Sequence, residues 1–259
     1  ASLADFDKAG ALDAAIAGPQ QVWKNMAYEN KDSLFQVDAN GVLRTSAPFD
    51  FESNLQVRIL SDCPEPTGQN RMPYLTCLSE MIHACSAGIE GGTLVLFTNY
   101  ADLRHCFHAL RPRWEKLGRS LYAQGEGYSR TDLRNRLMTE GDVLLLGAES
   151  FWKGFDAKGP ALSQVIVTRL PFENPGHPLL EAKTELLREQ GKSSFAEHFL
   201  PSAVIRFRQG IGRLIRSKTD VGDLVVLDSR ILRKNYGKSF LNELPKQNYE
   251  IFSSDELLQ

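Results

Sequence analysis

The chain has 259 residues, of which 42% are hydrophobic and 24% charged, and its formal net charge at pH 7 is −2. These values are typical of a soluble globular protein and exclude a disordered chain or a collagen-like repeat. No segment approaches the roughly 18 to 20 consecutive apolar residues of a membrane-spanning helix, and the first residues do not resemble a signal peptide, so we expect a cytoplasmic protein with no membrane partner. The small net charge means that any site for a polyanion must be local.

Residues 1–45 and 46–259 differ in pattern. The first region is an irregular lead-in with one short helical pattern, Ala11–Trp23. In the second, strand-like and helix-like runs alternate, and most strand-like runs are continuously apolar, as in strands buried on both faces. The expected strands are Leu55–Leu60, Thr93–Phe97, Ser120–Ala123, Val143–Gly147, Gln164–Thr168 and Leu224–Asp228. The expected helices are Tyr74–Ala87, Asp102–Leu110, Arg130–Thr139, Leu179–Gln190, about Ser202–Ile215, and Arg230–Glu243. This alternation predicts an α/β domain with a doubly wound, mainly parallel sheet and helices on both faces.

The cysteines and histidines do not form the pattern of a metal site. His105 and His108 are three residues apart on an expected helix, without a third ligand placed beside them. The four cysteines contain no CxxC pair and are Cys63, Cys77, Cys85 and Cys106. We therefore expect reduced thiols and no bound zinc or iron–sulfur cluster.

In an open parallel sheet, ligands bind beyond the carboxyl ends of the strands, and the loop Ala148–Gly159 follows such an end. The loop contains two glycines, three aromatic residues, two lysines and two carboxylates. Ser150 is suited to a phosphate, Gly154 to a close approach of the backbone to a ligand, and Asp156 to a ribose hydroxyl. The same composition also fits a loop that folds over a neighbouring helix with its aromatic residues as a local core.

The run Ile205–Arg216 is basic and contains no acidic residue. On a helix, Gln209, Arg213 and Arg216 lie within about 60° of one another and so share one stripe. Guanidinium groups on one stripe suit phosphate, because two parallel N–H donors match two phosphate oxygens. The alternative is a basic helix face that pairs with acidic residues of another element.

Glycines give two further indications. Gly210 and Gly212 each cost about 1 kcal/mol inside a helix, which favours a close approach of another backbone or a ligand there. A phosphate-binding loop of the form GxxxxGK[ST] is missing, because Gly191-Lys192-Ser193 and Gly237-Lys238-Ser239 both have leucine at the position of the first glycine. The chain thus has arginines for a triphosphate without a loop to hold it.

Three segments resemble motifs of superfamily-2 helicases of the DinG/XPD type. Gln209–Arg216 (QGIGRLIR) resembles motif VI, Leu94–Tyr100 (LVLFTNY) resembles motif IV, and Ser150–Asp156 (SFWKGFD) resembles motif V. Their order and spacing agree with that family over about residues 45–245. This region is similar to the second RecA-like domain of those helicases.

The resemblance implies a role for each matching residue. Arg213 and Arg216 would be catalytic arginine fingers on the γ-phosphate of ATP, which the first RecA-like domain would hold together with Mg²⁺. Gln209 would contact the nucleotide, and Gly154 and Asp156 would couple the nucleotide to the DNA. The residues implied for the backbone of single-stranded DNA are Thr98, Asn99, Tyr100 and Ser150.

By this resemblance, the chain is the second motor domain of an ATP-dependent DNA helicase that acts in DNA repair and moves 5′ to 3′, with single-stranded DNA and the first RecA-like domain as partners. Without a P-loop or a Mg²⁺-binding acidic motif, we expect the chain alone not to hydrolyse ATP. Two other interpretations stay open. One is an inert helicase-like module that binds nucleic acid or a protein, and the other is a stand-alone nucleotide-dependent enzyme such as a sugar-nucleotide transferase.

Overall fold

The structure of the chain is a computed structural model that describes residues 35–37, 43–45, 54–152, 161–215, 220–244 and 249–258. The chain divides into two units, Ala1–Asp50 and Phe51–Gln259. In the first unit, strands β1 (Phe35–Val37) and β2 (Leu43–Thr45) pair in antiparallel fashion. The expected helix Ala11–Trp23 lies outside the described residues.

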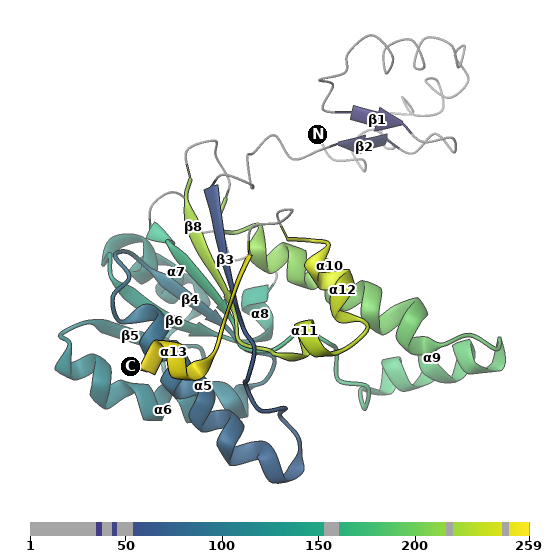
Figure 1. Cartoon of the computed structure of the whole chain (residues 1–259), viewed down its shortest axis with the longest axis horizontal. Helices are drawn as coiled ribbons and strands as arrows, with labels where there is room; N and C mark the ends of the chain where they lie inside the picture. Colours follow the sequence, from purple (N-terminus) through teal and green to yellow (C-terminus); the bar gives the residue numbers. More distant parts are fainter. Residues whose placement is uncertain are drawn as a thin grey trace. The chain divides into compact units, whose positions relative to one another are not determined.

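The second unit is built on a seven-stranded sheet in which every pair of neighbouring strands is parallel (Figure 1). In spatial order the strands are β5 (Ser120–Ala123), β6 (Val143–Gly147), β4 (Thr93–Leu96), β7 (Gln164–Val167), β8 (Gly222–Val226), β3 (Leu55–Leu60) and β9 (Tyr249–Phe252). The chain therefore crosses the sheet repeatedly, and successive strands are added on both sides of β4. This order confirms the expected α/β fold with a doubly wound parallel sheet.

Helices cover both faces of this sheet. On one face, α5 (Arg71–Ser86) and α6 (Tyr100–Lys116) pack over strand side chains that include Val95, and α13 (Ser254–Leu258) packs against α5. On the opposite face, α8 (Glu149–Trp152) and α10 (Leu200–Ile211) pack together beside Leu96. The connection from β5 to β6 contains α7 (Arg130–Thr139), which packs against β6.

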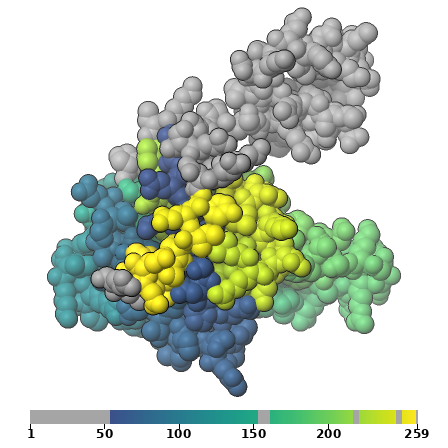
Figure 2. All heavy atoms as spheres, in the orientation of Figure 1, coloured from purple at the N-terminus to yellow at the C-terminus, as the bar shows by residue number. Residues whose placement is uncertain are grey.

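Helix α9 (Pro178–Glu189) stands apart from the core. All of its residues are at least partly exposed, and Figure 2 shows this helix, in green, projecting from the body of the domain at the right of the view. It begins with proline at the first helical position, where the missing N–H is harmless. The chain returns to the core through the π-helix η3 (Phe195–Phe199), which continues directly into α10.

Most expected elements are confirmed within one or two residues, and the exceptions have identifiable causes. Helix α6 continues to Lys116 through Pro112, where the sequence predicts an end near Leu110, because Trp114 in the last turn is fully buried and anchors that turn. The expected strand Leu224–Asp228 is shifted, since β8 begins at Gly222 and ends at Val226. The edge strand β9 was not expected at all.

The expected helix Arg230–Glu243 is wrong as a single element. It consists of α11 (Arg230–Arg233) and α12 (Gly237–Leu241). A Cβ at Gly237 would lie 1.9 Å from the carbonyl oxygen of Ile231, so the chain folds back on itself there in a way that only glycine permits. The expected helix ending near Ile215 is also wrong, because α10 ends at Ile211.

Candidate functional site

Several of the predicted site residues gather at the carboxyl ends of β4 and β6. Thr98 and Asn99 follow β4 and are half-buried, Tyr100 begins α6 and is 48% exposed, and Ser150 lies in α8, just beyond β6. Because β4 and β6 are neighbours in a parallel sheet, the segments that follow them leave the same edge of the sheet side by side (Figure 1). This edge is where ligands of open α/β sheets bind.

The Asn99 side chain is fixed by the start of α6. Its carbonyl oxygen accepts the backbone N–H of Asp102 at 2.8 Å, and its amide nitrogen donates to the Asp102 carboxylate, also at 2.8 Å. Asp102 is only 2% exposed and pairs with Arg71 at the start of α5. This cap determines the backbone path through Thr98, Asn99 and Tyr100.

Gln124 connects the segment after β4 with the segment after β6. It directly follows β5, and its amide nitrogen donates to the hydroxyl oxygens of Tyr100 at 2.6 Å and Ser150 at 2.8 Å. Its amide oxygen accepts the backbone N–H of Ala148 at 2.9 Å. Gln124 is not among the site residues that the sequence predicts. A polar residue at the carboxyl end of an expected strand, followed by a glycine, would have indicated a site residue here.

Two aromatic residues after β6 form local core. Phe151 is fully buried against Gly147, where a Cβ would lie 2.5 Å from the Phe151 ring. Trp152 is 1% exposed, and its indole N–H donates to the carbonyl oxygen of Phe97 at 2.7 Å. Phe151 and Trp152 therefore both follow the second interpretation of this loop, in which its aromatic residues form a local core. Gly154 and Asp156 lie outside the described residues.

The end of α10 differs from the expected stripe of three residues. Gln209 is exposed on the helix, but Arg213 lies in a turn beyond the helix end, and Arg216 is outside the described residues. A Cβ at Gly210 would lie 3.0 Å from the Trp152 ring, so the close approach at this glycine is made by a side chain rather than by the backbone or ligand that the sequence suggested. Gly212 is instead the C-cap residue that ends the helix.

Arg213 is buried in this arrangement, with 5% of its surface exposed. Its guanidinium donates to the carbonyl oxygen of Trp152. Burial, together with the positive charge of Arg130, lowers the pKa of Arg213 to about 10, so the side chain still carries its charge at neutral pH.

Two other arginines of α10 have counter-ions from distant parts of the chain. Arg206 pairs with Glu173 at 2.7 Å, and Arg208 pairs with Glu243 at 3.6 Å. For these two residues, the alternative of a basic helix face paired with another element is therefore correct.

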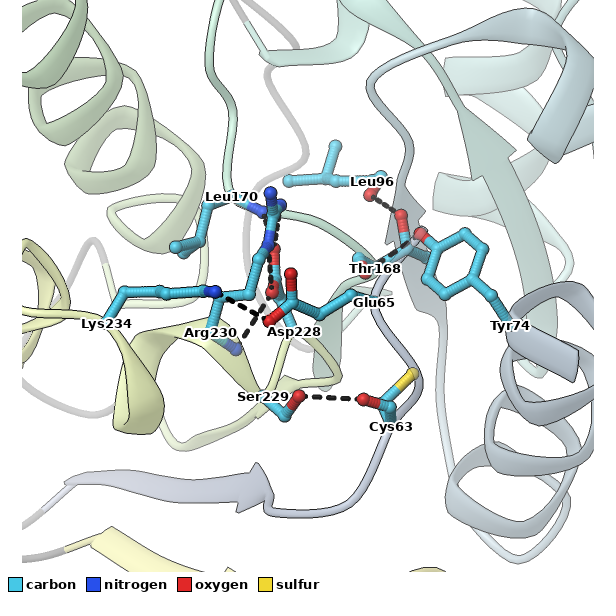
Figure 3. Close-up of polar contacts among 10 residues, drawn as sticks. All are labelled: Cys63, Glu65, Tyr74, Leu96, Thr168, Leu170, Asp228, Ser229, Arg230 and Lys234. Carbon is cyan, nitrogen blue, oxygen red and sulfur yellow. Dashed lines mark hydrogen bonds and ion pairs between the residues drawn. The ribbon is translucent and has the colours of Figure 1, made fainter. Parts of the chain in front are cut away.

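A buried polar network joins the carboxyl ends of β7 and β8 (Figure 3). Asp228 accepts the backbone N–H of Leu170 at 2.8 Å and binds the Arg230 guanidinium through both carboxylate oxygens. Ser229 donates to the carbonyl oxygen of Cys63 at 2.7 Å. The carboxylate raises the pKa of Arg230, because it favours the charged guanidinium over its neutral form. Since these charges already satisfy one another, the network stabilises the edge of the sheet rather than offering a binding site.

The described part of the chain contains no group of three or more histidine, cysteine, aspartate or glutamate residues placed to hold a metal ion. In that same part of the chain, the structure has no helix long and apolar enough to cross a membrane. The cysteines are all free thiols.

The helicase C-terminal domain family matches residues 82–247, well over half of the chain. The chain belongs to this family. Among its relatives, the protein named 3′-5′ exonuclease DinG of Bacillus subtilis is 36% identical over 216 residues, which are 83% of this chain and 23% of that protein. The ATP-dependent DNA helicase YoaA of Haemophilus influenzae is 38% identical over 179 residues, or 69% of this chain and 27% of that helicase. The chain therefore spans about a quarter of the length of these relatives.

Solved structures agree with this helicase C-terminal domain in fold. An XPD helicase matches with a TM-score of 0.56 at 17% identity, over 77% of this chain and 35% of that one. Xpd4 of S. tokodaii also has a TM-score of 0.56, at 18% identity, over 77% of this chain and 38% of that one. The chain is thus a helicase C-terminal domain with DinG and YoaA among its relatives, and it shares the RecA-like fold of these XPD structures, as the resemblance in sequence implied.

Proposed function

We propose that this domain is the second motor domain of an ATP-dependent DNA helicase, in which Arg213 and Arg216 act as arginine fingers and the edge after β4 and β6 forms part of the track for single-stranded DNA. The names of the relatives support ATP as the fuel and DNA as the substrate. By family resemblance, we include movement 5′ to 3′, a role in DNA repair and a cytoplasmic location in the proposal.

The observation that carries the proposal is the double contact of Trp152. Its indole N–H holds the carbonyl oxygen of Phe97, the residue just before Thr98, while its own carbonyl oxygen accepts from Arg213. One buried residue, through its side chain and its backbone carbonyl, thus connects the proposed DNA segment with the proposed finger. A motor needs such a link, because nucleotide hydrolysis must be coupled to movement along the strand.

Arg213 needs to move in order to act on a nucleotide. At 5% exposure its guanidinium faces the Trp152 carbonyl, so the working enzyme would have to turn it toward ATP held by the first RecA-like domain. The Trp152 carbonyl is a neutral acceptor, and a γ-phosphate with its negative charge is a stronger acceptor for the same N–H donor. Gln209, exposed one turn earlier, would contact the nucleotide, and Arg216, Gly154 and Asp156 keep the roles that the motifs imply.

The proposed contacts with DNA come from uncharged hydrogen-bond donors. Tyr100 and Ser150 present hydroxyl groups, and the backbone at Thr98 and Asn99 follows a path fixed by the cap on α6. Contacts of this kind hold phosphates without reading bases, as a translocating motor requires. ATP and Mg²⁺ would be held mainly by the first domain.

The test is an ATPase assay with and without single-stranded DNA on two samples: the full-length protein that carries this domain beside a P-loop domain, and the isolated chain. We expect turnover in the full-length protein that rises with DNA, and none in the isolated chain. A full-length protein that binds DNA but hydrolyses no ATP would instead favour the inert module, and turnover by the isolated chain would contradict the assignment of the P-loop to another domain.

A further inference from the structure

Gln124 lies outside the three segments that resemble helicase motifs, so the resemblance implies no role for it. We propose that Gln124 positions the hydroxyl groups of Tyr100 and Ser150 so that both donate to one phosphodiester group of single-stranded DNA. This inference rests on the proposed function, and it adds a residue outside the three motifs to the DNA track.

The orientation of the Gln124 amide is determined by the backbone. Its oxygen lies 2.9 Å from the backbone nitrogen of Ala148, which is a donor only, so the oxygen and not the nitrogen must face that group. The amide nitrogen then faces Tyr100 and Ser150. Each of its two hydrogens has one hydroxyl oxygen as acceptor, so the donors of this amide are used completely.

This arrangement decides where the hydroxyl protons point. An amide nitrogen does not accept hydrogen bonds, so neither Tyr100 nor Ser150 can donate to it. Both hydroxyl groups accept from Gln124 and keep their own protons for another acceptor. With distances of 2.6 and 2.8 Å to the shared nitrogen, the two hydroxyl oxygens are at most about 5.4 Å apart, the sum of those distances. Two donors at such a spacing suit two oxygens of one phosphate.

The neighbouring backbone fixes the position of Gln124, while the Tyr100 side chain stays accessible to solvent. The backbone N–H of Gln124 continues the sheet by donating to Leu146 at 2.9 Å. Gly125 follows with a φ of +91°, which strains any other residue, and a Cβ there would lie 3.9 Å from the Tyr100 ring. Tyr100 is 48% exposed, so a phosphate can reach its hydroxyl. A phosphodiester also fits the neutral donors, because it brings the negative charge itself.

The test measures single-stranded DNA affinity of the full-length protein with a fluorescent oligonucleotide and with copies that carry one uncharged methylphosphonate at successive positions. For the wild type, we expect one position where the neutral linkage weakens binding about tenfold. In Gln124→Leu, affinity for unmodified DNA should fall about tenfold, and the effect of the neutral linkage at that position should disappear. Gln124→Glu should bind more weakly still, because a carboxylate draws both hydroxyl protons inward and repels the phosphate.

Two controls keep the result decisive. Gln69→Glu introduces the same charge at an exposed glutamine on η1 (Gly68–Asn70) and should leave the affinity unchanged. Tyr100→Phe and Ser150→Ala each remove one hydroxyl group and should reduce the effect at the same linkage, which tests the arrangement even if Gln124→Leu fails to fold.

The outcomes separate this inference from the proposed function. If the wild type binds DNA but the position-specific effect persists in Gln124→Leu and in both hydroxyl variants, the positioning role is wrong and the helicase proposal stands. If the wild-type protein does not bind single-stranded DNA, the proposed function itself fails.

Discussion

The hydroxyl groups after β4 and β6 and the arginine after α10 are close neighbours through Trp152, yet they are prepared for their ligands in opposite ways. Tyr100 is half exposed and its hydroxyl proton is already turned away from Gln124. Arg213 is buried, and its guanidinium donates to the Trp152 carbonyl oxygen of the same domain. The proposed DNA contacts are therefore preorganised within this domain, whereas the proposed arginine finger is held in a buried position.

This difference indicates how the domain would take part in a two-domain motor. A track that is already formed can hold the strand in every state of the cycle. A finger that leaves its resting partner only for a phosphate would act when the first domain brings the nucleotide close, because only then is a better acceptor present. The following variants are designed to impair either the proposed DNA contacts or the proposed arginine finger, and to show which of the two has changed.

We expect the largest effect from Arg213→Ala in the full-length protein. Loss of an arginine finger removes charge stabilisation from the transition state, and ATPase turnover should fall by about 10³-fold or more. Affinity for single-stranded DNA should stay within about twofold of the wild type, since Arg213 does not face the track. The matched control is Arg208→Ala, an exposed arginine in the last turn of α10 paired with Glu243, which should retain turnover. An equal loss of DNA binding in Arg213→Ala would move this residue to the DNA side.

Gly210→Ala should affect both sides, because it displaces Trp152. In an open helix, this change would stabilise by about 1 kcal/mol, but here the new methyl group would lie 3.0 Å from the Trp152 ring and 3.2 Å from Leu96. We expect a net loss of about 1 to 2 kcal/mol in the free energy of unfolding, measured by urea denaturation, and a several-fold loss of DNA-stimulated ATPase.

Gly176→Ala is the control for this substitution. Its added methyl group would lie 3.6 Å from the Asn174 side chain, an ordinary contact in an exposed turn, and stability should change by less than about 0.5 kcal/mol. Equal stability of the Gly210→Ala and Gly176→Ala variants would mean that Trp152 yields without cost and does not connect the two sides.

Tyr100→Ala should break the DNA side alone. We expect affinity for a labelled single strand to fall about tenfold in the full-length protein, with turnover at saturating DNA close to that of the wild type. Titration at two salt concentrations should show weaker binding at high salt for both proteins, because phosphate contacts dominate the affinity. Unchanged affinity and unchanged unwinding would remove the segment after β4 from the track and leave only the nucleotide half of the assignment.

A charge pair far from both sides should give the smallest effect. Glu80 on α5 accepts two hydrogen bonds from Arg113 on α6, at 2.5 and 2.8 Å, and this pairing lowers the pKa of Glu80. A carboxyl group with a lowered pKa in the folded state stabilises the fold above its ordinary pKa, and this contribution disappears as the pH falls through the lowered value. Because both side chains are partly exposed, Glu80→Gln should cost less than about 1 kcal/mol at pH 7.

The pH dependence provides the measurement. The difference in unfolding free energy between wild type and Glu80→Gln should be constant from pH 6 to 8 and shrink below about pH 4.5. ATPase and DNA binding should be the same in both proteins. A difference that grows toward low pH would show that the pairing with Arg113 is not what stabilises the carboxylate.

The sheet was largely predictable, because its inner strands are buried on both faces and appear in the sequence as apolar runs. The fully buried strands Thr93–Leu96, Val143–Gly147 and Gln164–Val167 were expected within one residue of their observed bounds. Edge strand β9 gives no such signal, since three of its four residues are exposed. The break between α11 and α12 depends on the approach of Gly237 to the Ile231 backbone, a contact that no local pattern reveals.

The candidate site was predictable in its motifs but not in its geometry. The residue types around Tyr100, Ser150 and Arg213 indicate phosphate chemistry, which is why the sequence pointed to them. The burial of Arg213 results from Trp152, which is distant in sequence and packs against Gly210. Gln124 meets Tyr100 and Ser150 only because β5, β6 and β4 are adjacent in the sheet.

The position of β3 in the sheet also has a consequence for the order in which the domain assembles. β3 is the first strand of the sheet to be synthesised, yet its neighbours are β8 and β9, the last two, with Leu55 opposite Gly222 and Val57 opposite Tyr249. A ribosome adding about 5 to 20 residues per second needs on the order of ten seconds or more to deliver these partners. During that time β5, β6, β4 and β7 can already pair with one another, whereas the apolar side chains of β3 wait without a neighbour on either side. The nascent chain thus leaves β3 unpaired until β8 and β9 have been synthesised, and the sheet can close only then.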